Sequence, residues 1–352
     1  MDNLLLLTRL SMRNTERMRV SRLYFGCFLL VLFLASAVFA LNPDRHISQY
    51  GHTAWRIQDG FFGGQVRTVT QTTDGYIWVG TEAGLFRFDG VRFVSLSSQE
   101  VEQMPSTSIT ALLGARDGSL WIGTDAGLVH RVNQHLITYL KGEGYISSIL
   151  QDVNGEIWIA RDRSGDNTQP LCKVIGIGVH CYGNEDGVPA FLAGPLVQDA
   201  SSNLWIGGDT TLLRWRPGSS NAYRPKALKS NAGVDGVEAL SVAADGSLWV
   251  GMALSGSGRG LQHLVDGGLK SFVAPKLNGE TIEVTELLED HEKNLWVGTS
   301  NRVSTEFTVL TSIIIERQTV YRVTSYSSFT KIVKATSGWL RRKASIASVT
   351  FG

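Results

Sequence analysis

Clustered basic charge and metal-binding patterns are scarce in the body of this chain. The whole sequence has a net charge of +1, but residues 1–22 carry +3 and residues 301–352 carry +6, which leaves −8 for residues 23–300. Phosphate binding requires a clustered basic face, so this acidic body argues against a nucleic-acid partner. The seven histidines lack metal-ligand spacing, and no nucleophile–base pair stands at an interpretable spacing. We therefore expect no metal, no cofactor and no catalytic residue.

Cysteine is also rare, which limits the disulfide framework. Of the three cysteines, Cys27 lies in an apolar segment near the N-terminus, and Cys172 and Cys181 flank Gly176-Ile177-Gly178. A hairpin centred on these glycines places Cys172 and Cys181 opposite each other. In an oxidising compartment they would form a cross-strand disulfide. The alternative is a pair of small apolar side chains.

What the chain has in abundance is a tryptophan repeat. The motif Asp74-Gly75-x-x-Trp78-x-Gly80-Thr81 returns around Trp121, Trp158, Trp205, Trp249 and Trp296, with spacings of 43, 37, 47, 44 and 47 residues. A large aromatic in a repeated strand can wedge between neighbouring sheets, and the following glycine lets an adjacent chain come close. We interpret these tryptophans as structural.

The second copy shows what one repeat contains. Short apolar strands are expected at 109–115, 120–124, 128–132 and 136–140, separated by turns such as Asp117-Gly118. Four antiparallel strands in about 40 residues are typical of one propeller blade. The sequence therefore predicts an all-β fold, a β-propeller of four-stranded blades with six recognisable blade motifs.

The N-terminus has the pattern of a targeting segment. Five arginines precede an uncharged apolar run over residues 23–40, and small residues end that run at Val38-Phe39-Ala40. We expect residues 1–40 to be a signal peptide cleaved after Ala40 or an uncleaved membrane anchor helix. In both cases the blades lie in the periplasm or outside the cytoplasm, and residues 23–40 are the candidate inner-membrane anchor.

The first repeat and the residues before it resemble the two-component regulator propeller family. The resemblance is carried by Tyr50-x-x-x-x-Trp55-x-x-x-Asp59-Gly60 and by the run from Val66 through Trp78-Val79-Gly80-Thr81 to Phe88-Asp89-Gly90. It covers about residues 45–300 and is looser in the third and fourth repeats, where Ala160 and Gly208 replace motif residues. Members of that family usually close at seven blades, which makes this chain an incomplete ring.

The resemblance implies an extracytoplasmic ligand-sensing propeller at residues 42–300. Family members usually continue into a membrane helix and a kinase or cyclase module, and nothing after Trp296 resembles either. Residues 301–352 contain no Asp, no Pro and only two glycines. We interpret them as a divergent tail in which the blade pattern ends, either disordered or produced by a lost reading frame.

Candidate ligand contacts follow from the repeat offsets. Acidic residues stand four positions after the first four motif tryptophans: Glu82, Asp125, Asp162 and Asp209. Equivalent positions lie on one rim of a propeller, so these acids could form a cation- or sugar-binding arc. Alternatively, acids simply suit a turn next to glycine. Arg161 and Arg163 flank Asp162, a mixed cluster suited to a carboxylate or a polyol.

Three functions stay open from the residues alone. A sensor that binds a small molecule or an oligosaccharide agrees best with the missing catalytic pairs. A propeller lyase of the streptogramin-cleaving type would need a histidine and an acid converging on one face. A scaffold or a non-functional truncated fragment is the third alternative, because propellers host unrelated activities.

The incomplete ring leads to a prediction about association. Without further strands, the blades at residues 65–95 and 285–299 each present an unpaired flank, and free strand edges favour association. We expect the exported chain to be marginally stable and to self-associate at low micromolar concentration, as measured by light scattering. Addition of one more blade should give a monomer. A compact, cooperatively unfolding monomer of the present chain would contradict this expectation.

Overall fold

The computed structural model describes most of the repeat region. Described are residues 64–89, 91–142, 144–162, 168–224, 228, 236–274, 277–289, 293 and 295–303, and strands at 51–52, 307–316, 319–324 and 345–346. The chain forms two compact units, Met1–Asp44 and Arg45–Gly352. The signal or anchor segment predicted over residues 1–40 lies outside the described residues. Among the described residues, no helix combines the length and the apolar character that a bilayer crossing requires.

The described part of the second unit contains six four-stranded antiparallel sheets, each made of consecutive strands. The first three are β2 (Val66–Gln71), β3 (Ile77–Thr81), β4 (Gly84–Phe88) and β5 (Phe93–Ser95); β6 (Ile109–Gly114), β7 (Leu120–Thr124), β8 (Gly127–Val132) and β9 (His135–Tyr139); and β10 (Tyr145–Gln151), β11 (Ile157–Asp162), β12 (Leu171–Ile175) and β13 (Gly178–Tyr182). The other three are β14 (Ala193–Gln198), β15 (Leu204–Gly208), β16 (Leu212–Arg216) and β17 (Ser219–Tyr223); β18 (Val237–Val242), β19 (Leu248–Met252), β20 (Leu261–Val265) and β21 (Gly268–Ser271); and β24 (Val284–Glu289), β25 (Leu295–Val303), β26 (Phe307–Glu316) and β27 (Thr319–Thr324).

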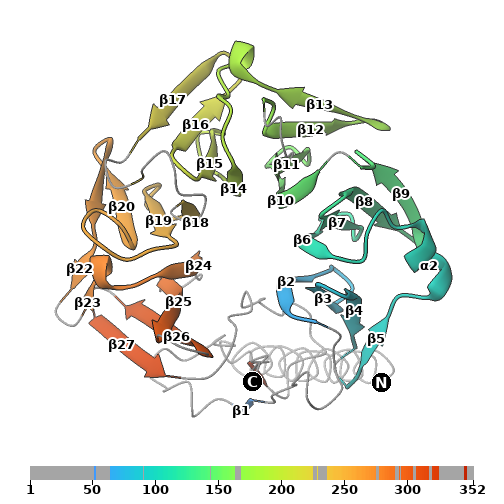
Figure 1. Cartoon of the computed structure of the whole chain (residues 1–352), viewed down its shortest axis with the longest axis horizontal. Coiled ribbons are helices and arrows are strands. Elements are labelled where there is room, and N and C mark those ends of the chain that lie inside the picture. The colour runs from blue at the N-terminus through green and yellow to red at the C-terminus, as the bar shows by residue number, and fades with distance from the viewer. Residues whose placement is uncertain are drawn as a thin grey trace, which may run out of the picture. The chain divides into compact units, whose positions relative to one another are not determined.

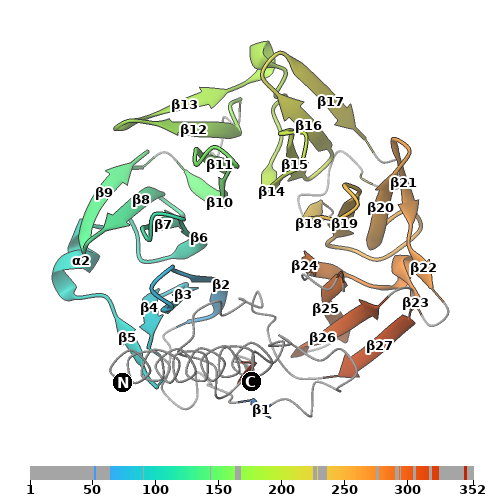
Figure 2. The ribbon, with the colours of Figure 1, turned by 180° about the vertical axis from the view of Figure 1, so that it is seen from behind.

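These sheets are blades arranged around a common axis. The first strand of each sheet is innermost in both face-on views (Figures 1 and 2). Successive inner strands contact each other, from β2 to β6, β10, β14, β18 and β24. The all-β propeller of four-stranded blades is therefore confirmed, and the four strands expected in the second repeat agree with β6 to β9 to within one residue at each end.

Smaller elements join the blades. Two-stranded sheets form from β1 (Gly51–His52) with β28 (Ser345–Ile346), and from β22 (Val273–Ala274) with β23 (Leu277–Asn278). A short helix that the sequence did not predict lies between the first two blades: α2 (Ser98–Gln103), which begins with a capping box between Ser97 and Glu100. Two 3-10 turns, η3 (Asn184–Asp186) and η4 (Gly279–Thr281), lie in later connections.

The repeat tryptophans fill the space between neighbouring blades, as predicted. Trp121 is 5% exposed and belongs to a core cluster with Ile146, Ile159 and Cys172 of the following blade. Some indole N–H groups donate a hydrogen bond to the residue six positions earlier in the sequence. The Nε1 of Trp158 donates to Asp152 at 3.1 Å. In the next blade Trp205 Nε1 donates to Asp199 at 2.9 Å.

The glycine two residues after the tryptophan sets how closely blades pack. A Cβ on Gly123 would lie 2.8 Å from Cγ2 of Ile146, the β-branched residue at the start of the next inner strand. Gly80 has the same relation to Ile109, with 2.5 Å. In the same way, a Cβ on Gly207 would clash with Val237, and a Cβ on Gly251 would clash with Val284. A side chain at these glycines would push the next blade away, since real Cβ atoms do not approach so closely.

The third blade departs from the motif and compensates for it. Its glycine is replaced by Ala160, and the facing residue of the fourth blade is Ala193 in place of isoleucine or valine. Both alanines are buried in one core cluster. The volume gained on one side is therefore offset by the volume lost on the other, which agrees with the tolerance of cores to volume-conserving exchange.

The sixth blade corrects an expectation about the tail. The blade pattern was expected to end at residue 300, but β25 continues to Val303, and β26 and β27 complete the sheet. The physical reason is the missing turn glycine. Thr81 and Thr124 are followed three residues later by glycines at which the chain reverses, whereas the strand after Thr299 simply extends and pairs with β26. The flank expected to be unpaired at residues 285–299 is thus paired with β26.

The blade contact gives a testable double-mutant cycle. We expect Gly123→Ala to lower the free energy of unfolding by about 1–3 kcal/mol through overpacking. Ile146→Ala should lower it by about 2–5 kcal/mol through a cavity. The double variant, which imitates Ala160 and Ala193, should be more stable than the sum of the two losses predicts.

Urea unfolding of the four proteins measures the coupling. Gly178→Ala is the matched control, because its nearest neighbour would be a backbone oxygen at 3.8 Å and its φ is ordinary. It should leave stability nearly unchanged. Strictly additive losses would show that Gly123 and Ile146 do not restrain each other.

Candidate functional site

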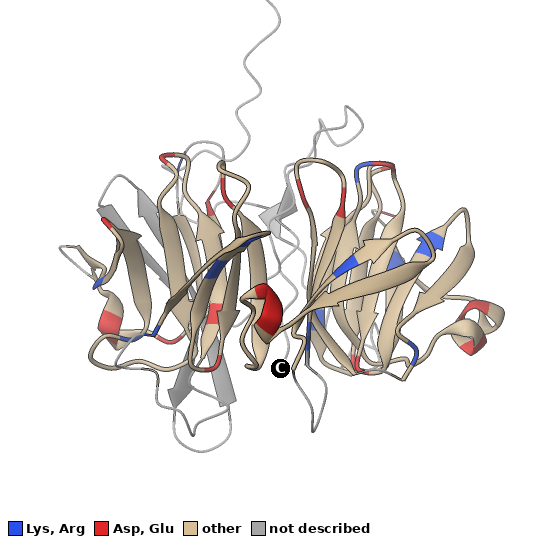
Figure 3. Ribbon diagram, turned by 90° about the horizontal axis from the view of Figure 1, so that it is seen from above, with Lys and Arg blue, Asp and Glu red and all other residues tan. Residues whose placement is uncertain are grey.

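The predicted acidic residues occupy equivalent turns on one face of the ring. The backbone N–H groups of Glu82, Asp125 and Asp209 donate to the carbonyl oxygen of the residue near the start of each inner strand, at 3.1, 3.3 and 3.3 Å. Because β3, β7 and β15 end at this face, the three turns share one rim. Figure 3 shows the ring from its edge, with acidic residues on several loops of the upper rim. Asp162 ends β11 at the corresponding position, and Arg163 lies outside the described residues.

Each inner strand carries a β-bulge at the same place, next to this rim. The bulge residues are unpaired in the register with the second strand. Each stands eleven residues before its repeat tryptophan: Arg67, Thr110, Ser147, Gly194, Glu238 and Thr285. We refer to these six positions as the bulge ring. Bulges are frequent at the rims of sheets and next to functional sites, because they redirect side chains.

Charged and polar groups of alternate blades meet around the axis. Tyr145, the first residue of β10, is within electrostatic reach of Arg67 on β2, Glu238 on β18 and Asp125. Since β2, β10 and β18 belong to alternate blades, these groups come together across the axis of the ring. Arg67 also forms an ion pair with Glu82, with 2.6 Å between Nη2 and Oε1. The pair is half exposed, so it contributes little to stability.

The environment around the axis disfavours negative charge. Burial raises the pKa of Tyr145, an effect that Arg67 opposes by its charge and a hydrogen bond and that Glu238 and Asp125 reinforce. Desolvation also raises the pKa of Glu238. The Glu238 residue is exposed to solvent on the inner strand β18. Perturbed titratable groups that converge in one place are characteristic of functional sites.

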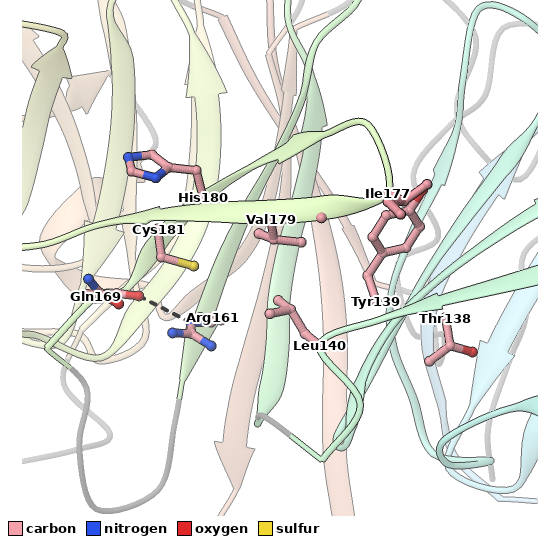
Figure 4. A pocket seen from close by; sticks show the side chains of 10 residues that line it. Thr138, Tyr139, Leu140, Arg161, Gln169, Ile177, Val179, His180 and Cys181 are labelled. Carbon is pink, nitrogen blue, oxygen red and sulfur yellow. Dashed lines mark hydrogen bonds between the residues drawn. The ribbon is translucent and has the colours of Figure 1, made fainter.

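A separate cavity lies between the second and third blades. It has a volume of about 600 Å³ and is lined by β9, β13 and the end of β11. Arg161, one of the predicted ligand contacts, is 4% exposed and lies at this cavity, where its Nε donates to the carbonyl oxygen of Gln169 at 3.2 Å (Figure 4). The structure therefore separates Arg161 from the acidic rim residues with which the sequence had grouped it.

The cavity wall contains Cys181, one of two paired cysteines. Cys172 and Cys181 are directly opposite each other on β12 and β13, and their sulfur atoms form a disulfide of 2.07 Å. The hairpin reverses at Gly176, as its sequence predicted. Its tip contacts the second blade, because the Tyr139 hydroxyl donates to the Gly176 carbonyl oxygen at 3.3 Å.

Two histidines occupy equivalent positions in their blades, although their distances from the repeat tryptophans differ in the sequence. His130 and His263 pair across the strand with Trp121 and Trp249, and the rings stack at 3.9 and 4.0 Å. They stand nine and fourteen residues after their tryptophans, because the fifth blade has a longer turn. Burial lowers the pKa of both imidazoles, partly offset by a nearby aspartate.

The contacts of His263 do not activate the Ser247 hydroxyl as a nucleophile. The Ser247 hydroxyl donates to Asp245 at 2.6 Å, so its proton points to the carboxylate, and the Nε2 of His263 contacts the same oxygen at 2.7 Å. A catalytic base must instead accept the serine proton. His263 and His130 are therefore stacking partners of the tryptophans of their blades.

Comparison with known proteins agrees with the motif analysis. The family model described as the two-component regulator propeller matches residues 60–83 and 103–126. The model thus matches the first two repeats, the part of the chain whose motif predicted this family. No curated protein matches this chain.

Solved structures share the fold at low identity. Virginiamycin B lyase of Staphylococcus aureus with Quinupristin is 11% identical, with a TM-score of 0.55 over 73% of this chain and 83% of that one. An extracellular domain assigned to a hybrid two-component system of B. thetaiotaomicron is 15% identical, with a TM-score of 0.40 over 75% of this chain and 46% of that one. This chain spans about half the length of that domain. These likenesses concern the propeller fold alone.

The raised pKa of Glu238 predicts a pH-dependent effect of Glu238→Gln. Below the ordinary value of 4.5, Glu238 is protonated in both the folded and the unfolded chain. As the pH rises, the unfolded chain ionises first, so the folded state loses stability until the pH passes the raised folded pKa. Glutamine does not titrate. The variant should therefore gain stability relative to the natural protein as the pH rises above the ordinary value of 4.5.

Urea unfolding at several pH values tests this prediction. Glu185→Gln, at an exposed site on η3, controls for the loss of one negative charge. A stability difference for Glu238→Gln that stays constant or shrinks with rising pH would show that Glu238 is not desolvated.

Proposed function

We propose that this propeller is the extracytoplasmic ligand-binding module of a two-component-type receptor. The observation that carries the proposal is the convergence of Arg67, Tyr145 and Glu238 around the axis of a propeller with two-component regulator repeats. A binding module needs convergent polar groups on a rigid scaffold; the bulge ring supplies Arg67 and Glu238, and the first residue of β10 supplies Tyr145. The described blades serve binding and not catalysis in this proposal.

Two features support a location outside the cytoplasm. Arginines followed by the apolar run at residues 23–40 have the order of an export or anchor segment. The Cys172–Cys181 disulfide suits an oxidising compartment, because cytosolic thiols are kept reduced. The receptor that contains the propeller would transmit ligand binding at the axis to an output module.

The ligand class proposed for the axis is a small polar molecule or an oligosaccharide. Arg67 and Glu238 supply a donor and an acceptor, and the Tyr145 ring is 36% exposed and offers an amphipathic surface. Aromatic rings with polar tips suit ligands that combine an apolar face with hydroxyl groups. The acidic turns at Glu82 and Asp125 add acceptors near the same rim.

A ligand screen tests the proposal. Thermal-shift measurements of the purified chain against an oligosaccharide library should find a ligand that raises the melting temperature, because binding to the folded state alone stabilises it. Arg67→Met and Glu238→Gln should each abolish that shift.

Arg92→Ala is the matched control, since Arg92 is 78% exposed on the outer turn of the first blade. It should keep the shift. A ligand whose effect survives both axial variants would place binding elsewhere, and a screen of polar small molecules and oligosaccharides without any hit would contradict the proposed function.

A further inference from the structure

Two members of the bulge ring bring charge to the axis of the propeller. Thr110 and Ser147 use their hydroxyl groups within the fold, because each donates to a backbone carbonyl oxygen, at 2.6 and 3.0 Å. The glycine of the fourth blade and the threonine of the sixth blade carry no charge at this position. Arg67 on β2 and Glu238 on β18 are the charged bulge residues. They decide which charge a ligand at the axis meets.

Negative charge predominates among the described groups of this cluster. Arg67 is matched by a carboxylate, since its Nη2 lies 2.6 Å from Oε1 of Glu82. Arg67 also forms a hydrogen bond with Tyr145, on which Glu238 and Asp125 act by their charge. Three carboxylates thus stand against one guanidinium. A cavity mouth with this balance attracts a positively charged ligand more strongly than an anion.

Glu238 is the carboxylate best placed to receive that cation. It is exposed on the inner strand β18, so a ligand can reach it. Desolvation nevertheless raises the pKa of Glu238, which shows that water solvates its charge incompletely. A bound cation would offset part of this cost. Glu82 already pairs with Arg67 and therefore offers less to a ligand.

Tyr145 provides a second contact for a cation. It is 36% exposed at the start of β10 and lies within electrostatic reach of Glu238. The face of a tyrosine ring attracts ammonium groups, and the same ring packs against C–H groups of a ligand. A guanidinium has more N–H groups than contacts with Glu82 and Tyr145 require. Arg67 can therefore also donate to hydroxyl oxygens of a ligand.

We propose that the axial cluster of Arg67, Tyr145 and Glu238 binds a hydroxylated primary ammonium, such as an amino sugar. The ammonium group pairs with Glu238 and lies over the Tyr145 ring, and hydroxyl oxygens accept hydrogen bonds from Arg67. This inference rests on the function proposed above. It narrows the ligand class from polar molecules and oligosaccharides in general to those that carry a positive charge.

Two sugars that differ in a single group test the ligand class by isothermal titration calorimetry on the purified chain. D-glucosamine carries an ammonium group at about pH 6, where D-glucose has a hydroxyl group. Glucosamine should bind in the millimolar range or tighter and about tenfold more tightly than glucose, and added salt should weaken its binding. In Glu238→Gln the two sugars should bind equally weakly. Glu185→Gln, at an exposed site on η3, should keep the difference.

A second measurement covers the case in which Glu238→Gln does not fold. Amide chemical shifts of the natural protein titrated with glucosamine should change at residues 66–68, 145–147 and 237–239 and not at residues 177–181. Shift changes that map elsewhere, equal affinity for the two sugars, or an unchanged preference in a folded Glu238→Gln protein overturn the inference.

The inference and the proposed function can fail separately. If glucosamine does not bind at millimolar concentration but a neutral polar ligand binds at the axis, the inference is overturned and the proposed function stands. If no screened ligand binds at the axis, both are overturned.

Discussion

The packing of one blade onto the next is the constraint on which the rest of this structure depends. The motif glycine is the point of closest approach, where Ile109, Ile146, Val237 and Val284 contact the preceding blade. Because four-stranded sheets have no other way to cover their apolar faces, these contacts fix the spacing of all inner strands. The exchange to Ala160 and Ala193 in the third blade shows that the summed volume matters more than the identity of either residue.

Fixed inner strands explain why polar residues converge at the axis. A bulge at the same register position in every blade leaves one residue unpaired, and the ring repeats this position six times. In an ordinary strand Arg67 and Glu238 would be separate surface residues. Held by the ring, they lie within electrostatic reach of Tyr145. The fold thus brings residues at one position of the repeat, which are far apart in the sequence, close to one another.

The third blade illustrates how a repeat gains a specific feature. Arg161 replaces a turn-closing threonine, the following segment is longer, and the hairpin β12–β13 carries a disulfide. At Arg161 the turn loses the two hydrogen bonds that Thr124 makes in the second blade. Arg161 instead lines a pocket together with residues of β9 and β13. Departures from a repeat are therefore informative positions for function, because the remaining copies show what packing alone requires.

The sequence by itself determined the blades, because the tryptophan spacing, the Asp-Gly turns and the strand alternation are local properties. It also predicted the pairing of Cys172 with Cys181, whose separation within one hairpin is local as well. The tertiary structure alone decided which polar groups meet. Arg67, Tyr145 and Glu238 lie in three different repeats, and Tyr145 stands thirteen residues before its tryptophan, whereas the two bulge residues stand eleven before theirs. The tertiary structure also decided that the Arg161 side chain lies at the pocket beside Gln169. The direction of a side chain depends on its place in the strand. Local patterns fix the strands, whereas the packing of the blades around one axis decides which side chains meet.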